Sequence, residues 1–456
     1  MDQRNDADER EPRGRHANQI DAPGSQLNKE PIEGDGIDRR NFLSCMAWAG
    51  TGLLWTMAGG VPTSRLFADT SGGVGQESHR KMSEGFSFVQ ISDSHIGFNK
   101  AANQDVTATL RESIDRINAL PRQPAFLLHT GDITQLSAPN EFDTAQQLIT
   151  SARTTSGRTF FVPGEHDVIG DAGAKYLQHY GKGTQGGGWY SFDHQGVHFI
   201  ALVNVLDLKP GGLGNLGREQ LEWLERDVKR LSSSTQIVVF AHVPLWAVYP
   251  EWGWGTDDGA LALTYLRRFG SVTVLNGHIH QVVQKVEGNV RFHTAMSTAF
   301  PQPAPGTAPS PGPLTVPAEQ LRNFLGVTSV TIVPKQHSLA LVDSTLSGVA
   351  GVQAAHSMDD MKRGAEKRTV RVVPGEIGID NFSFTPRELS IAVGETVTWR
   401  NHDDVPHQIV SADRKFTPSS VLDTGQSYQR TFDRAGSFPY FCSLHPTMTG
   451  TVVVRA

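Results

Sequence analysis

The chain has 456 residues, 38% of them hydrophobic, with 46 glycines and 25 prolines. This length exceeds one ordinary hydrophobic core, so we expect two or three loop-rich globular units. The formal net charge of -6 lacks the basic excess that nucleic-acid-binding proteins usually show, so there is no nucleic-acid-binding signature.

Residues 1–38 are charged, polar and almost free of aromatic side chains, which predicts a disordered tail. The next segment, 39–68, begins with Arg39-Arg40, continues with a mildly apolar stretch and offers a cleavage site after Ala68. It resembles a twin-arginine export signal. The alternative is an uncleaved anchor, through which alone the protein would contact a membrane. Either way, we expect the rest of the chain to be periplasmic or secreted.

Between residues 83 and 345, short apolar runs alternate with segments of helical apolar spacing. The runs predict strands within 86–92, 124–132, 159–167, 235–245 and 271–281, and the helical spacing predicts helices within 105–120 and 218–231. Hairpins are expected at 189–204, with a turn near Gln195-Gly196, and at 326–346. The alternation predicts α/β layers with a sheet between helices.

Two further segments divide the chain by composition. Six prolines within 301–313 predict an extended loop, which we interpret as an insertion over the sheet edge. Residues 346–367 are polar and rich in small residues, which predicts a linker. From 368 to 456, period-two alternation with glycine and proline punctuation predicts a separate all-β domain.

Potential metal ligands follow each predicted strand of the α/β region. Loops beyond the strand ends of such sheets share one crevice, so these side chains can meet. Asp93 and His95 are two residues apart, as are His278 and His280, so in extended chain each pair points to one face. Singly, each motif has a plainer interpretation; His242, between apolar residues, would more often be a core histidine. The candidates are Asp93, His95, Asp132, Glu165, His166, His242, His278 and His280.

The ordered set D-x-H, GD, GEHD, H and GHxH resembles the signature of the calcineurin-like metallophosphoesterases over residues 83–345. The resemblance implies a two-layered β-sandwich flanked by helices, with two metals at one end. One metal would be held by Asp93, His95, Asp132 and His280, and the second by Asp132, Glu165, His242 and His278. Asp132 would bridge the metals, and His166 would stabilise phosphoryl oxygens or protonate the leaving group.

Mixed carboxylate and imidazole ligands suit two divalent or trivalent ions of iron, manganese or zinc. The implied reaction is in-line attack on phosphorus by a metal-held hydroxide, while both metals neutralise charge on the transferring group.

Glu165 departs from the family pattern, which has asparagine at this position. A carboxylate adds negative charge and reaches one methylene further than an asparagine. Three outcomes are open: Glu165 ligates the second metal, swings away and leaves that site weak, or hydrogen-bonds His166. We favour ligation, because an unpaired carboxylate beside two metal-binding histidines has no better partner.

A second ligand set lies near the C-terminus. Cys442, His445 and Met448 occupy one loop at C-x2-H-x2-M spacing, and His407 follows a predicted strand. Two imidazoles, a thiolate and a thioether form the ligand set of electron-transfer copper, which predicts one copper ion. His402 is a competing histidine. Residues 368–456 resemble a cupredoxin of the amicyanin or plastocyanin kind, which implies an all-β Greek-key sandwich, one-electron chemistry and a redox partner.

Two functions compete. The favoured one is an exported, dinuclear-metal-dependent phosphoester hydrolase, acting on monoesters or diesters and carrying an auxiliary blue-copper domain. The alternative is a copper-binding electron-transfer protein whose phosphoesterase fold is weakly active or inactive. The aromatic residues after His242 either shelter the substrate or only pack in the core; these are Trp246, Tyr249, Trp252 and Trp254.

Overall fold

The computed structural model describes residues 53–58, 61–66, 85–333, 338–348 and 373–456. The chain divides into two units, Met1–Thr70 and Ser71–Ala456. In the first, β1 (Leu53–Ala58) and β2 (Val61–Leu66) pair antiparallel. Both strands fall within the predicted export signal, whose remainder, like the predicted tail, lies outside the described residues. Among the described residues, no helix is long and apolar enough to cross a membrane.

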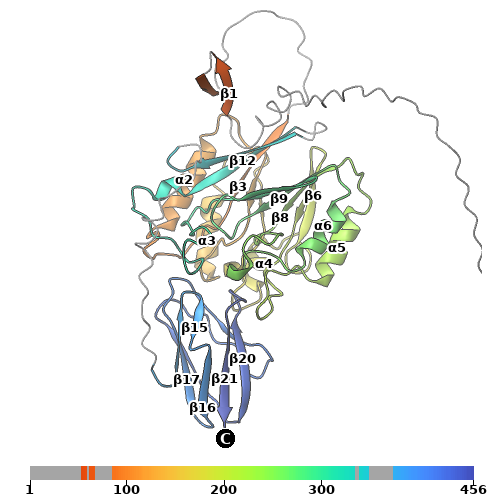
Figure 1. Ribbon diagram of the computed structural model, residues 1–456. Coiled ribbons are helices and arrows are strands. Elements are labelled where there is room, and N and C mark those ends of the chain that lie inside the picture. Colours follow the sequence, from red (N-terminus) through yellow and green to blue (C-terminus); the bar gives the residue numbers. More distant parts are fainter. Residues whose placement is uncertain (1–52, 59–60, 67–84, 334–337, 349–372) are drawn as a thin grey trace, which may run out of the picture. The chain divides into compact units, whose positions relative to one another are not determined.

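Two sheets form the larger part of the second unit (Figure 1). Their strands are β3 (Phe86–Ile91), β4 (Leu127–His129), β5 (Thr159–Phe161), β6 (Tyr190–His194), β7 (Val197–Ala201), β8 (Gln236–Phe240), β9 (Ser271–Asn276), β10 (Gln284–Glu287), β11 (Val290–Thr294), β12 (Gly326–Val333) and β13 (Ser338–Thr345). One sheet has the order β10-β11-β9-β8-β7-β6 and the other β13-β12-β3-β4-β5. Because β3, β4 and β5 run parallel, as do β7, β8 and β9, their C-terminal ends gather at one edge of each sheet.

The two sheets enclose a common core. Phe86 and Phe88 of β3 and Val197 and Phe199 of β7 belong to one buried cluster drawn from both sheets. Since successive side chains of a strand point to opposite faces, Val89 of β3 is buried on the other side, among helix residues. This arrangement confirms the predicted β-sandwich flanked by helices.

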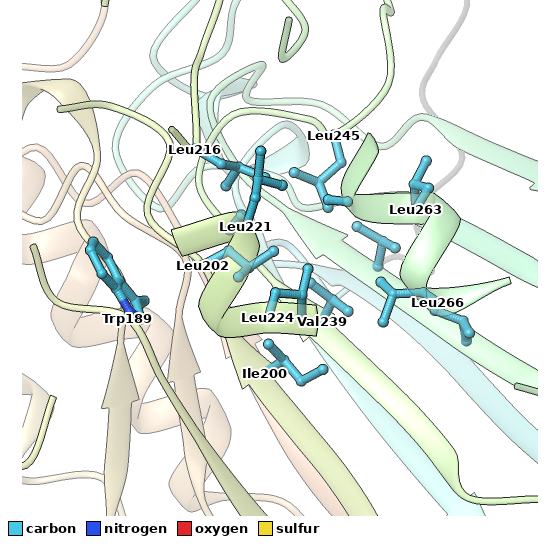
Figure 2. Close-up of a cluster of buried hydrophobic side chains, with 14 of the residues drawn as sticks. Trp189, Ile200, Leu202, Leu216, Leu221, Leu224, Val239, Leu245, Leu263 and Leu266 are labelled. Carbon is cyan, nitrogen blue, oxygen red and sulfur yellow. The ribbon is translucent and has the colours of Figure 1, made fainter. Parts of the chain in front are cut away.

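Helices cover the outer faces. On the five-stranded sheet lie α2 (Val106–Asn118) and α3 (Pro139–Ile149), and on the six-stranded sheet α5 (Arg218–Val228) and α6 (Gly259–Leu266). Figure 2 shows Leu221 of α5 and Leu263 of α6 over Ile200 and Val239 of the sheet. The periodicity did not predict α3, α6 or α4 (Ala174–Tyr180). Helix α6 is mostly apolar, so it lacks the polar face that reveals a helical period.

The described residues from 373 to 456 form a second, all-β fold, as predicted. Its strands are β14 (Glu376–Asp380), β15 (Ser383–Thr385), β16 (Glu388–Ala392), β17 (Thr396–Asn401), β18 (Ile409–Ser411), β19 (Ser427–Thr431), β20 (Gly436–Cys442) and β21 (Thr449–Arg455). They form two sheets, ordered β15-β14-β17-β19 and β16-β21-β20-β18. Trp399 of one sheet and Val452 of the other are fully buried in a shared core. Residues 349–372, which hold most of the predicted linker, lie outside the described residues.

Candidate metal centres

The predicted ligands of the larger fold gather where its parallel strands end. Asp93, Asp132, His242 and His278 each lie within three residues of the end of β3, β4, β8 and β9, respectively. Glu165 lies in a short 3-10 turn after β5. All eight candidates are buried except His278, which is half-buried. The fold therefore brings the predicted residues into one interior site.

The backbone of this site is strained. Asp93, His95, Asp132, His278 and His280 have positive φ angles of 53°, 41°, 51°, 71° and 54°. Each such residue costs about 1–3 kcal/mol and persists only where the surroundings enforce it. The pairs Asp93/His95 and His278/His280 thus converge through left-handed backbone. The prediction that each pair lies in extended chain was wrong. Hydrogen bonds between loops hold this conformation, such as His95 N to Asp132 O at 2.9 Å.

One group of ligand atoms comes from Asp93, His95 and His280, whose atoms all lie within 4.8 Å of one another. His280 Nε2 lies 3.4 Å from Asp93 Oδ1 and 3.3 Å from His95 Nε2. Two imidazole nitrogens and a carboxylate oxygen thus face a common point.

A second group comes from Asp132, Glu165, His242 and His278. Asp132 Oδ2 lies 3.3 Å from His242 Nε2 and 3.5 Å from His95 Nε2. Asp132 therefore reaches both groups, which is the position that a bridging ligand requires.

Three atoms of the second group test whether it fits a metal ion. Glu165 Oε2, His242 Nε2 and His278 Nδ1 are buried and have no hydrogen-bond partner among the described residues. They nevertheless lie close together: Glu165 Oε2 is 3.0 Å from His242 Nε2, and Glu165 Oε1 is 2.9 Å from His278 Nδ1. Buried polar atoms without partners are rare and call for a ligand. The donors present fit a cation.

Backbone carbonyl groups orient three of the imidazoles. His242 Nδ1 bonds Thr130 O at 2.7 Å, and His280 Nδ1 bonds Phe300 O at 2.6 Å. His166 Nδ1 bonds the main-chain oxygen of Gln135 at 2.9 Å. A carbonyl oxygen only accepts, so Nδ1 carries the proton in each ring. In the neutral rings Nε2 keeps its lone pair, which metal ligation requires of His242 and His280 and which lets His166 take up a proton before passing it on.

The site concentrates negative charge. Burial raises the pKa of Glu165, but His278 and His242 outweigh it and hold that pKa well below its usual value. Burial and the charge of Glu165 raise the pKa of Asp132. His242 and His166 outweigh both effects, so the pKa of Asp132 lies below its usual value. Three buried carboxylates, Asp93 included, need positive charge beside them.

Asp167 is a positioning residue to which the sequence analysis gave no role. Its carboxylate accepts hydrogen bonds from the main-chain N–H groups of Ile133, Thr134 and Gly164 at 3.1, 2.8 and 2.9 Å. Burial and the charge of Asp132 raise the pKa of Asp167 to about 7, although these bonds oppose the rise. Asp167 thus joins the loop after β4 to the loop that carries Glu165 and His166. The only indication of this role in the sequence was that Asp167 directly follows the candidate ligands Glu165 and His166.

Gln135 and Gly164 also shape the site. Gln135 Oε1 lies 2.9 Å from His95 Nδ1, while its main-chain oxygen holds His166. No feature of the sequence distinguished Gln135. At Gly164, a Cβ atom would lie 2.1 Å from Asp132 Oδ1. The glycine before Glu165 is therefore required for the two loops to approach.

The aromatic residues after His242 divide into two kinds. Trp246 and Trp254 are buried in the core. Trp252 is half-buried and lines a cavity that Glu165 and His278 also line, and Tyr249 packs edge-on against it, with ring centroids 5.1 Å apart. Of these four residues, Trp252 is thus the one that lines the cavity beside the ligand groups.

The second predicted ligand set also converges. Cys442 Sγ lies 3.5 Å from His407 Nδ1 and 3.6 Å from His445 Nδ1, and the two Nδ1 atoms are 3.3 Å apart. Burial raises the pKa of the Cys442 thiol, but His407 and His445 outweigh it and hold the pKa well below its usual value. A buried thiolate between two imidazoles fits a copper ion.

Two further residues lie beside this ligand set. Asp403 Oδ2 lies 2.9 Å from His407 Nε2 and orients the ring. Met448 is buried, and its main chain bonds Cys442 and His445. His402, the competing histidine, does not belong to the group of ligand atoms.

Comparison with known proteins identifies relatives of both folds. The calcineurin-like phosphoesterase family model matches residues 86–282, and the plastocyanin/azurin family model of copper-binding proteins matches 372–455. Amicyanin of Paracoccus versutus is 32% identical over 114 residues, which cover 23% of this chain and 86% of amicyanin. Plastocyanin of Scenedesmus fuscus is 34% identical over 94 residues, covering 18% of this chain and 96% of plastocyanin. A 3',5'-cyclic-nucleotide phosphodiesterase of Nostoc sp. is 26% identical over 230 residues, covering 47% of this chain and 79% of that enzyme.

Proposed function

We propose that this chain hydrolyses phosphoesters at a two-metal site. It belongs to the calcineurin-like phosphoesterase family through residues 86–282 and to the plastocyanin/azurin family of copper-binding proteins through residues 372–455. The observation that carries the proposal is the pair of adjoining ligand groups, both reached by Asp132. Their mixed carboxylate and imidazole donors suit iron, manganese or zinc. Bound metals would lower the pKa of a water molecule and neutralise charge on the phosphoryl group.

The side chains have distinct roles in this proposal. Asp93, His95 and His280 hold one ion, Glu165, His242 and His278 hold the other, and Asp132 joins them. His166 is the proton-transfer residue: Gln135 O fixes a proton on its Nδ1, so Nε2 is the nitrogen left to exchange a proton with the substrate. The main-chain N–H of His166 also donates to Asp132 Oδ1 at 3.0 Å, which ties the position of His166 to that of the bridging carboxylate.

A phosphodiester is the favoured substrate. The Nostoc relative is named as a cyclic-nucleotide phosphodiesterase, and that similarity is the support for a diester in place of a monoester.

The C-terminal fold binds one copper ion in this proposal, through His407, Cys442, His445 and Met448, and exchanges electrons with a redox partner. We further propose that the segment 39–68 directs the chain out of the cytoplasm, either as a cleaved signal or as an anchor. The arginine pair at its start supports export.

Metal analysis combined with activity assays tests the function. The full chain, purified and loaded with manganese or iron, is assayed on bis(para-nitrophenyl) phosphate and on para-nitrophenyl phosphate. We expect hydrolysis that a chelator abolishes and that His166→Ala lowers by about 10²–10⁴-fold. His179→Ala, a histidine on α4 away from the ligand groups, is the matched control and keeps full activity.

A specific observation also favours the alternative function, because His407, Cys442 and His445 form a ligand group of their own, separate from the groups of the phosphoesterase fold. Inactivity on both esters with two metals bound, together with reversible bleaching of a blue absorption band, would favour an electron-transfer protein.

A further inference from the structure

The phosphoesterase fold and the copper-binding fold lie in one compact unit, Ser71–Ala456, and they meet at the metal site. One cavity is lined by Glu165 and His278 of the first fold and by residues 444–447 of the second. The ring centroids of His166 and His445 lie 6.5 Å apart. A segment of the loop between β20 and β21 (residues 443–448), which we call the copper loop, therefore lies beside the groups assigned to phosphoester hydrolysis.

Specific contacts join the two folds, one of them at the copper loop itself. Gly211 N donates a hydrogen bond to Pro446 O at 2.6 Å. Lys100 Nζ lies 3.6 Å from Asp423 Oδ2, and Ile169 is buried within the hydrophobic core of the copper-binding fold. A polar, an ionic and an apolar contact thus link the phosphoesterase fold to the copper-binding fold.

The lining of the cavity indicates what it accepts. Val205, Val243, Trp252 and Leu444 supply apolar surface near Glu165. No lysine or arginine is among the described residues that line it. Additional phosphate groups on a substrate would therefore meet no lysine or arginine in this cavity. An uncharged organic group would instead be sheltered by apolar surface.

The cavity is also narrow, with a volume of about 20 Å³, roughly that of one or two water molecules. A substrate group entering it must press against its walls. The side chains of Leu444 and Thr447 belong to the wall that the copper fold supplies, so their bulk sets how large a group can enter.

We propose that the segment Leu444–Thr447 of the copper loop is the outer wall of the phosphoester pocket and selects esters whose organic group is small and uncharged. This inference rests on the proposed hydrolysis for its substrate class, but the shared pocket itself is testable without turnover. Since His445 both lines the cavity and belongs to the copper ligand group, occupancy of the pocket perturbs the copper site.

Two wall variants act in opposite directions. Thr447→Trp fills the cavity, and Leu444→Ala widens it. We expect Thr447→Trp to raise KM for methyl para-nitrophenyl phosphate about tenfold, and Leu444→Ala to raise kcat/KM for the bulkier bis(para-nitrophenyl) phosphate about tenfold. Thr431→Trp, on exposed strand β19 of the same fold, is the matched control and changes neither value. Adenosine triphosphate is hydrolysed poorly by all four proteins. The presence of a blue band, whatever its wavelength, shows that each variant has folded.

Binding is measured separately by titrating inorganic phosphate into the full chain loaded with manganese and copper(II), using calorimetry and the visible spectrum. We expect phosphate to shift the blue band of the wild type and to bind about tenfold more weakly to Thr447→Trp. Phosphate binding that leaves the band unmoved and is equal in wild type and Thr447→Trp would overturn the shared pocket. An absence of hydrolysis, with the spectral shift present, would overturn only the proposed function.

Discussion

The Oε2 atom of Glu165 lies 3.0 Å from Nε2 of His242, and both atoms are buried without a hydrogen-bond partner among the described residues. The other carboxylate oxygen lies 2.9 Å from His278 Nδ1. Of the three outcomes considered for Glu165, this geometry supports metal ligation. His166 directs its Nδ1 to Gln135 O instead.

Substitution of Glu165 tests that role. Glu165→Asn retains an oxygen donor, so we expect it to keep two metals per chain outside the copper site. Glu165→Ala removes the donor and should lose one of them. Elemental analysis after gel filtration measures the stoichiometry, and Glu141→Gln serves as a buried-carboxylate control. Equal metal content in wild type, Glu165→Asn and Glu165→Ala would show that Glu165 is not a ligand.

Loss of Asp167 should loosen the loops that carry the ligands. Its carboxylate accepts hydrogen bonds from both loops, and removal of such outer partners typically weakens metal affinity 10–100-fold. We expect Asp167→Ala to show about this loss in a competition assay with a chelator. Asp167→Asn keeps one oxygen acceptor, so its metal affinity should lie between those of Asp167→Ala and the wild type. Unchanged affinity in Asp167→Ala would contradict the positioning role.

Cys442→Ser should abolish the blue-copper site and leave phosphoester hydrolysis in place. The thiolate is the ligand that gives a blue-copper site its character, so the blue absorption band should disappear. We expect methyl para-nitrophenyl phosphate hydrolysis to stay within about threefold of wild type, because Cys442 is buried and is not among the residues that line the shared cavity. Loss of hydrolysis in a folded Cys442→Ser protein would mean that the copper site takes part in the reaction or shapes the pocket through His445.

His198 should make stability depend on pH. Its ring bonds Asp193 at 2.8 Å and Asp227 at 2.9 Å, which joins β7 to β6 and α5. Burial lowers the pKa of His198, but the two carboxylates outweigh it and raise the pKa above 6.5. The stabilisation is therefore complete below pH 6.5 and is lost as the pH rises through the raised pKa.

Thermal unfolding of wild type and His198→Asn at pH 6 and pH 9 measures this contribution. We expect the variant to be less stable by about 1–2 kcal/mol at pH 6, with a smaller difference at pH 9. An equal difference at both pH values would show that His198 acts only through packing.

The strands and helices could be predicted where a short stretch of sequence shows their apolar pattern. Strands such as β3 and β8 are short apolar runs that end in a ligand, and α2 and α5 have one apolar face, so their period is visible in the sequence. Helix α6 was missed because it is apolar on most sides. The left-handed backbone of Asp93 and His95 was also missed, since contacts with the loop after β4 enforce it.

The sequence by itself determined which donors this protein carries and in what order. Cys442, His445 and Met448 are spaced by the covalent chain within one loop, and the ligands of the larger site each follow their own strand. Only the tertiary structure decided which atoms meet: His242 is oriented by Thr130, 112 residues away, and the copper loop closes the cavity beside Glu165. Local spacing follows from covalent geometry, whereas such pairings depend on how the sheets and folds pack, which no short stretch of sequence contains.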